Sequence, residues 1–265
     1  MAKKATMLRT FATSAKIIAL FAVLAAGGCA TPPSDPAARA EFEHTNDPFE
    51  PLNRKIFDIN QFLDRILIKP IAVTYVASVP EEGRTAVRNI LSNLKEPVIF
   101  ANNMLQGEFK RAHDTVGRFA MNSTLGFAGV FDLATKAGLE KQTGDFGQTL
   151  YTWGVPDGPY LFLPILGPSN PRDAIGFGVD AYADPFSLAI SGNTITDADY
   201  GRFAIGGVDQ RAENIQTLDE VQRSAIDFYA ELRSLYRQHR AADLRHGEPP
   251  PLPELDNDEE PAPKH

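Results

Sequence analysis

Apolar side chains recur at helical spacing in the first third of the chain. One stripe advances by four and three residues in alternation, and its members are Leu52, Ile56, Ile59, Leu63 and Ile66. This spacing places them on one face of a helix. Asn46 or Asp47 is suited to cap that helix, with Pro48 in its first turn. The pattern therefore predicts an amphipathic helix through residues 52–66.

Two further segments have the same helical periodicity. A second helix is expected to begin near residues 80–82, where two carboxylates favour an N-terminus, and Pro97 is expected to end or kink it. The longest apolar stripe predicts one helix that ends near Gly247, and its members are Leu218, Val221, Ala225, Phe228, Leu232 and Leu235. Alternating strand patterns are scarce, so the fold class predicted from the sequence is all-α.

Four segments between the helices carry no charge: residues 71–80, 119–131, 158–171 and 185–196. Each is too short to cross a bilayer as a helix, which takes about 18–20 apolar residues. One such segment alone is typical of buried core. Four together also allow a helical body that lies within one leaflet of a membrane, and both interpretations stay open.

The first 28 residues have the composition of a signal peptide. Four basic residues and no acidic one precede Ile17–Ala26, an apolar run of ten residues, and small residues then lead to Cys29. This end resembles a bacterial lipobox, in which the cysteine is acylated and becomes the mature N-terminus. The alternative is ordinary signal-peptidase cleavage nearby, with Cys29 incidental. Ala30 follows where an aspartate commonly retains lipoproteins in the inner membrane, so the resemblance favours the outer membrane.

Composition divides the remaining chain into a domain and its flanks. Residues 29–45 are predicted to be an acylated flexible tether, and residues 247–265, rich in proline and acidic residues, a disordered tail. The domain lies between them, over residues 46–246. The net charge of −8 argues against a nucleic-acid partner, which requires clustered lysine and arginine.

The sequence offers little catalytic chemistry. It contains no HExxH motif, no GxSxG motif and no P-loop, and a single cysteine excludes a multi-cysteine metal site. Asp180 and Asp184 would share a helix face, but a metal there needs further ligands that the sequence does not supply, so they are interpreted as capping or arginine-paired carboxylates. We predict no enzyme activity, no metal and no cofactor.

The most distinctive stretch is residues 145–169, DFGQTLYTWGVPDGPYLFLPILGPS, followed by Arg172 and Asp173. It resembles the signature of the MlaA (VacJ) family of outer-membrane lipoproteins. Shorter stretches agree in the same order: residues 46–50, Asn53-Arg54, Asn93-Leu94, residues 105–107, Arg118-Phe119, residues 122–124 and Asp184-Pro185. The resemblance covers about residues 46–240.

This resemblance implies a function and a shape. Members of the family remove misplaced phospholipid from the outer leaflet of Gram-negative outer membranes and pass it to a periplasmic carrier. Their fold is a single helical ring in the inner leaflet with an amphipathic channel through it, commonly docked to trimeric porins. We therefore expect a lipid-anchored, periplasm-facing outer-membrane protein whose partners are phospholipid, a trimeric porin and the carrier.

The motif residues are assigned roles on the same basis. The candidates for the lipid path or for facing the membrane are Phe119, Phe127, Phe131, Trp153 and Tyr160, although core packing is an equal alternative for the last two. Gly154, Pro159, Pro164, Gly167 and Pro168 are expected to fix an irregular loop that crosses the ring. Two pairs, Asn53-Arg54 and Arg172-Asp173, are interpreted as internal polar ties in preference to headgroup ligands.

An alternative function remains open at this point: a structural lipoprotein that scaffolds porins or envelope complexes and moves no lipid. Bulky substitutions at Gly126 or Gly129 are expected to separate the two. In a channel they would disturb lipid asymmetry while protein abundance and porin association persist, whereas a scaffold would leave asymmetry intact.

Overall fold

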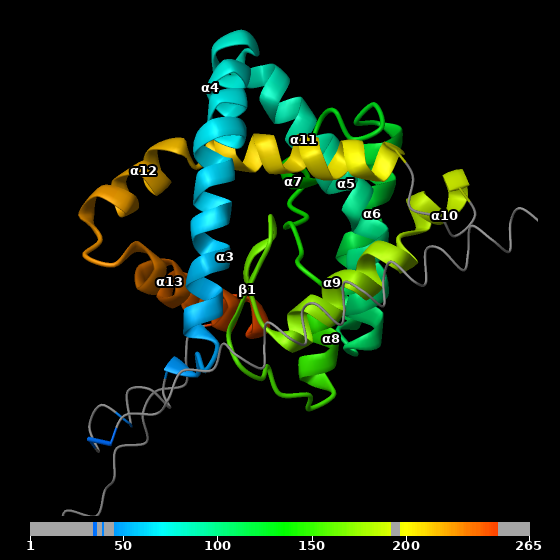
Figure 1. Ribbon diagram of the computed structural model, residues 1–265. Helices are drawn as coiled ribbons and strands as arrows, with labels where there is room; N and C mark the ends of the chain where they lie inside the picture. The colour runs from blue at the N-terminus through cyan, green and yellow to red at the C-terminus, as the bar shows by residue number, and fades with distance from the viewer. Residues whose placement is uncertain (1–33, 36–38, 40–44, 192–196, 249–265) are drawn as a thin grey trace, which may run out of the picture.

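The computed structural model describes residues 34, 35, 39, 45–191 and 197–248 (Figure 1). The predicted signal peptide, Cys29 and most of the tether lie outside the described residues, as does the tail beyond Glu248. The described part therefore covers the predicted 46–246 domain apart from residues 192–196.

The first predicted helix is present as α3, Glu50–Leu63. A π-helical turn, η1 (Asp64–Ile68), joins it to α4 (Lys69–Ser78). Pro70 at the start of α4 has no N–H to donate, and the widened turn lies directly before it. Helical structure therefore continues well beyond the residues that the stripe predicted.

The second predicted helix is α5, Glu81–Leu105, and it begins with Glu81 and Glu82 in its first turn as expected. Of the two alternatives at Pro97, an end to the helix is wrong, because α5 continues through that residue to Leu105, and a kink stays a prediction. The next helix, α6 (Phe109–Thr124), packs along α5. This packing stabilises a segment in which the proline removes one backbone hydrogen bond.

Short elements make up the middle of the chain. They are α7 (Leu133–Lys136), α8 (Phe146–Thr152), β1 (Leu161–Leu163), β2 (Gly167–Ser169), α9 (Pro171–Ala183) and α10 (Pro185–Ser191). The two strands form an antiparallel hairpin in which Leu161 pairs with Ser169 and Leu163 with Gly167. The predicted all-α class therefore needs one correction, because part of the expected irregular loop is this hairpin.

The last part is also helical: α11 (Asp197–Glu213), α12 (Ile215–Ser224) and α13 (Phe228–Leu244). The single long helix predicted from the stripe Leu218–Leu235 is wrong. The chain leaves helical geometry at Ala225, and the Asp227 side chain caps a new helix by accepting a hydrogen bond from the Ala230 N–H. An aspartate capable of capping thus interrupts a continuous apolar pattern.

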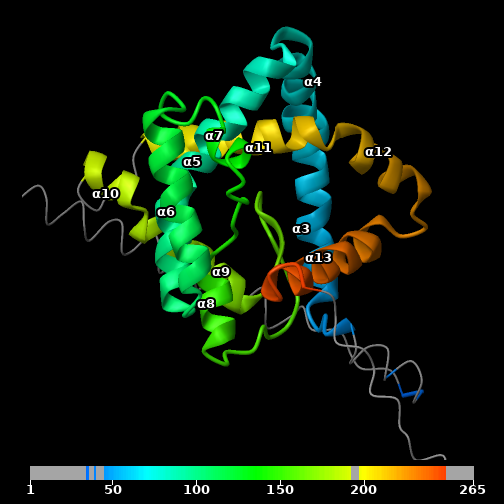
Figure 2. The same cartoon turned by 180° about the vertical axis from the view of Figure 1, so that it is seen from behind.

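The hairpin lies in the middle of the helices. In two opposite views it stands between α3 on one side and α5, α6 and α9 on the other (Figures 1 and 2). Its side chains join the principal buried apolar cluster of the described residues, which consists of Phe57, Tyr160, Phe162 and Tyr229. This small aromatic core fastens α3, the hairpin and α13 together.

Candidate functional site

The exterior of the described structure is unusually apolar. On α3, η1 and α4 the exposed large apolar side chains are Ile59, Phe62, Ile66, Leu67, Ile71 and Val73. On α9 and α11 they are Ile175, Phe177, Tyr182, Tyr200, Phe203 and Ile205. Extended apolar surface of this kind marks a binding or membrane-contact surface in a folded protein.

The interior is unusually polar. The largest fully buried side chains include Arg118, Glu96, Asn53, Asn103 and Thr115. Asparagine and charged residues are mostly exposed in water-soluble proteins, where large apolar residues fill the core. Here the usual distribution is inverted, and an inverted distribution suits a protein whose exterior contacts hydrocarbon.

A strained loop presents part of the apolar exterior. Phe127 and Ala128 have φ angles of 53° and 54°, and Gly129 follows at 91°. The left-handed region is unfavourable for residues with a Cβ, so the surrounding structure has to impose it. Phe127 is 76% exposed and packs edge to face on Phe131, which is also exposed. Phe119, at the C-terminal part of α6, is exposed as well.

Two glycines make this loop possible. A Cβ at Gly126 would lie 2.3 Å from the Phe131 carbonyl oxygen, and one at Gly129 would lie 2.6 Å from the Cβ of Asn93. Neither position has room for a bulky side chain unless the loop is rebuilt. The expectation that such substitutions obstruct a path in an otherwise intact protein is therefore wrong.

Arg118 anchors the base of the same loop. Its guanidinium donates to Glu96 (3.2 Å), Asp132 (3.0 Å) and the Leu139 carbonyl (2.5 Å). Burial raises the pKa of Glu96, and hydrogen bonding to Arg118 only partly offsets this. Burial also acts to raise the pKa of Asp132, but hydrogen bonds from Thr135 and Arg118 outweigh it and hold that pKa far below its usual range.

The start of the distinctive stretch, in α8, crosses closely over α9, which follows that stretch. A Cβ at Gly176 would lie 2.3 Å from the Gly147 nitrogen, so the two helices meet at their backbones. Arg240 of α13 binds both Asp145 (2.7 Å) and Asp173 (2.8 Å) beside this crossing. The conspicuous glycine and acidic residues of the stretch therefore hold three helices together.

Trp153 and Tyr160 lie in different environments. Trp153 is 56% exposed at the end of α8, packs edge to face on Phe146, and donates its indole N–H to the Leu105 carbonyl. Tyr160 is 3% exposed inside the aromatic core. Tyr160 therefore packs in the core, which was the alternative to a membrane-facing position. Of these two residues, only Trp153 is exposed.

The remaining motif residues shape the chain around the hairpin. Gly154 and Gly167 have φ angles of 85° and 83°, in the region that favours glycine. Pro159 precedes β1, Pro164 lies at the turn, and Pro168 lies within β2. These glycines and prolines thus restrict the backbone of the hairpin and of the segment that leads into it.

The two paired motifs make internal contacts. Asn53 is buried and bonds Asp47 and the hairpin backbone, while Arg54 pairs with Glu50 and Asp227. Arg172 is buried, bonds Asp173 (3.2 Å) and lies over the Tyr151 ring. Asp173 also accepts from Tyr236 (2.9 Å).

The carboxylates Asp180 and Asp184 also bond within the protein. Asp180 accepts from Asn102 and from the Phe146 N–H. Asp184 pairs with Arg202 at 2.7 Å and accepts from the Phe186 N–H at the start of α10. No cluster of metal-ligating side chains occurs among the described residues.

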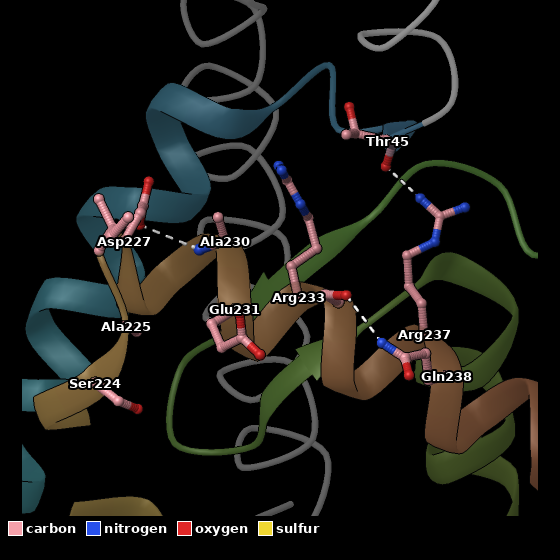
Figure 3. A pocket seen from close by; sticks show the side chains of 11 residues that line it. Thr45, Ser224, Ala225, Asp227, Ala230, Glu231, Arg233, Arg237 and Gln238 are labelled. Atoms are coloured by element: carbon pink, nitrogen blue, oxygen red, sulfur yellow. Dashed lines mark hydrogen bonds between the residues drawn. The ribbon is translucent and has the colours of Figure 1, made fainter. Parts of the chain in front are cut away.

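A pocket of about 740 Å³ lies along α13 (Figure 3). It is lined by Thr45, by the turn between α12 and α13, and by the side chains of Glu231, Arg233, Arg237 and Gln238. Arg237 donates to the Thr45 carbonyl, and Arg233 pairs with Asp47 at 2.7 Å. The polar groups here bind the segment that leads in from the tether, so the pocket is where residues 45–47 attach to α13.

The apolar stripe missed the inward face of α3. Its members Ile59 and Ile66 are exposed, whereas the buried face carries Asn53 and Phe57. Asn53 was identified only through the family resemblance, and its spacing of four from Phe57 was the available signal in the pattern. Glu96 was missed as well, because an isolated glutamate in a helix is normally solvated.

None of the helices in the described part of the chain is both long and apolar enough to cross a membrane. The exposed apolar side chains are spread over several elements. Together with the buried polar groups, they form the candidate functional site.

Comparisons with known proteins agree on one family. The family model described as MlaA lipoprotein matches residues 45–243. An uncharacterized protein of Rickettsia typhi is 36% identical over 203 residues, covering 76% of this chain and 79% of that protein. The intermembrane phospholipid transport system lipoprotein MlaA of Haemophilus influenzae is 32% identical over 232 residues, covering 86% and 89%.

The Escherichia coli protein of the same name is 32% identical over 215 residues, covering 80% of this chain and 81% of that protein. A solved structure described as "Structural basis for maintenance of bacterial outer membrane lipid asymmetry" superposes with a TM-score of 0.66 at 32% identity. It covers 75% of this chain and 98% of its own.

Proposed function

The chain belongs to the MlaA lipoprotein family, and we propose that its helices form a ring that lies within the inner leaflet of the outer membrane and offers phospholipid headgroups a polar path. As a member of this family it is an outer-membrane lipoprotein that maintains lipid asymmetry through intermembrane phospholipid transport. It is a transport protein and not an enzyme.

The inverted distribution of side chains carries the proposal. Exposed residues such as Ile66, Phe127 and Phe203 suit contact with acyl chains, while buried amides such as Asn103 and Asn122 suit a polar interior. Trp153 and the three phenylalanines Phe119, Phe127 and Phe131 are assigned to the lipid boundary.

Cys29 is proposed as the acylated anchor. One acyl chain gives only marginal membrane binding, whereas two or more anchor a protein stably. Sixteen residues join Cys29 to Thr45, and at about 3.3 Å each they extend to roughly 50 Å at most. The anchor therefore keeps the domain at the membrane without fixing its orientation.

Besides phospholipid, the proposed partners are a trimeric porin beside the ring and a periplasmic carrier that receives the lipid. The family resemblance supports both. The scaffold alternative predicts binding to a porin alone, and family membership in a lipid-transport system favours transport.

Complementation of a deletion strain tests the proposed function. The strain receives wild type, Cys29→Ala, or the matched control Thr31→Ala, and phospholipid exposed in the outer leaflet is measured with an outer-leaflet acyltransferase reporter. We expect exposure to rise on deletion and to fall again with wild type and Thr31→Ala but not with Cys29→Ala. Unchanged exposure on deletion would contradict lipid removal and leave a scaffold.

A further inference from the structure

One edge of the hairpin faces α3 instead of another strand. Strand β1 pairs with β2 through Leu161 and Leu163, so the backbone groups of Tyr160 and Phe162 point to the opposite side. An open strand edge leaves N–H and C=O groups that need partners when they are buried. Tyr160 and Phe162 are both buried.

Three asparagines supply those partners. Asn46 donates its side-chain amide to the Gly158 carbonyl, and its backbone carbonyl accepts from the Tyr160 N–H, both at 2.8 Å. Asn53 donates to the Tyr160 carbonyl (3.1 Å) and accepts from the Phe162 N–H (2.9 Å). We call Asn46, Asn53 and Asn60 the asparagine ladder.

The third member of the ladder holds the tip. Asn60 donates to the Leu163 carbonyl at 2.9 Å and accepts from the Ile165 N–H at 3.0 Å. Ile165 has a φ of 67° and is exposed at the turn of the hairpin, so its conformation depends on outside support.

The spacing of the ladder matches helix to strand. Asn53 and Asn60 are seven residues apart, which is two turns of α3 and about 10.5 Å of rise. Their backbone partners on the hairpin are three residues apart, which is about 10 Å along a strand. Because the two lengths agree, Asn53 and Asn60 can bond the hairpin backbone at the same time.

At residues 53 and 60 asparagine suits this task because its side-chain amide offers a donor and an acceptor together. Aspartate would keep only the acceptor, and an apolar residue would keep neither. The second member, Asn53, is also held by α13, because the buried carboxylate of Asp47 accepts from Asn53 (2.8 Å), Tyr229 (2.5 Å) and Arg233 (2.7 Å). The ladder is thereby joined to α13.

We propose that Asn46, Asn53 and Asn60 are positioning residues that set the register of the hairpin on α3, and so fix the height of its tip, Ile165 and Leu166, among the helices. This inference rests on the proposed function, since the tip lies in the middle of the helices that would surround the lipid path (Figure 2). The ladder touches the hairpin backbone and acts on lipid only through it.

Asn60 gives the sharpest test, because it is half-buried whereas Asn53 is fully buried. Hydrogen exchange of the full-length protein in bilayers is compared for wild type, Asn60→Ala and Asn60→Asp. Losing one net hydrogen bond should speed local exchange at the Ile165 amide by about five- to tenfold in Asn60→Ala. Asn60→Asp keeps the acceptor and should remain close to wild type at that amide.

Gln61→Ala is the matched control, because Gln61 is the neighbouring amide and makes no side-chain hydrogen bond within the described residues. It should leave exchange at Ile165 unchanged. In the deletion strain, Asn60→Ala at wild-type abundance should raise outer-leaflet phospholipid at least about twofold above the Gln61→Ala level, in line with the same lost hydrogen bond.

The outcomes separate the two claims. If Asn60→Ala leaves exchange at Ile165 unchanged, or speeds it while lipid asymmetry stays at the Gln61→Ala level, the ladder does not position the path and the inference is overturned. Failure of the wild-type gene to restore asymmetry would instead overturn the proposed function, whatever the exchange rates.

Discussion

Two cores of opposite chemistry hold this protein together. Around the hairpin, Phe57 packs edge to face on Phe162 and Tyr229, with ring centroids 5.5 and 5.6 Å apart. Between α5 and α6 the buried side chains are polar, with Glu96 and Arg118 at the centre. The first region resembles the core of a water-soluble protein and the second does not.

The proposed position of the helices in a membrane leaflet accounts for this difference. The hydrophobic effect drives apolar side chains inward where the outside is water. In lipid that force is absent, and helices associate through close packing and hydrogen bonds between polar groups. The α5–α6 region carries exposed apolar residues such as Leu125 and Phe127 outside its polar interior, which is the second arrangement.

The largest effect is expected from a substitution that breaks the polar core. Arg118→Met removes the cation from a pair in which Glu96 is 1% exposed, and should lower the free energy of unfolding by about 3–5 kcal/mol, because a buried carboxylate is left unpaired. Denaturant unfolding in detergent measures it. The double variant Glu96→Gln with Arg118→Met should recover part of this loss. If it is no more stable than Arg118→Met alone, the pair is not the source of the effect.

A smaller effect is expected at the loop that the polar core supports. Gly129→Ala adds a Cβ at a φ of 91° against Asn93 and should cost about 1–3 kcal/mol. The matched control is Gly138→Ala, which has a φ of 85° but no atom within 4 Å of the added Cβ. Thermal unfolding should show the larger loss for Gly129→Ala, and equal losses would mean that the contact with Asn93 is unimportant.

The smallest effect concerns acid stability at the α8–α9 crossing. Burial acts to raise the pKa of Asp173, but hydrogen bonding to Arg240 prevails and lowers that pKa below its ordinary value. A lowered folded pKa stabilises the protein above the unfolded pKa, and this stabilisation is lost as the pH falls through the folded pKa. Asp173→Asn should therefore give a flatter stability profile below about pH 4.

The control for that profile is Asp157→Asn, at an exposed carboxylate away from Arg240. It should retain the acid slope of wild type. Identical slopes for Asp173→Asn and wild type would show that Asp173 does not contribute to the loss of stability in acid.

Much of the helical architecture was predictable from periodicity and caps. The start of α5 followed from Glu81 and Glu82, and α3 followed from its apolar stripe. The break before Phe228 was not predictable from the stripe, because Asp227 interrupts the helix without interrupting the apolar pattern. Burial was the harder quantity: periodicity shows which residues share a face, but not whether water or lipid lies outside it.

The candidate site was likewise only partly predictable from the sequence. The resemblance located the stretch from Asp145 to Asp173, yet which of its aromatic residues are buried depended on the hairpin, whose three-residue strands are too short to show alternation. The asparagine ladder left a trace as the spacing of seven between residues 46, 53 and 60. That spacing is interpretable only once the strand beside α3 is known.

The central claim is that lipid covers the exterior, and Trp153, the only tryptophan, reports on it directly. Fluorescence of the acylated protein is measured in bilayers whose phospholipids carry bromine on their acyl chains, and again with acrylamide in the water. Phe127→Trp in a Trp153→Phe background gives a second exterior position, and Phe228→Trp in that background gives one beside the aromatic core. We predict strong quenching by brominated chains at residues 153 and 127, weak quenching there by acrylamide, and little quenching by either at residue 228. Strong acrylamide quenching at both exterior positions, without quenching by brominated chains, would contradict the account.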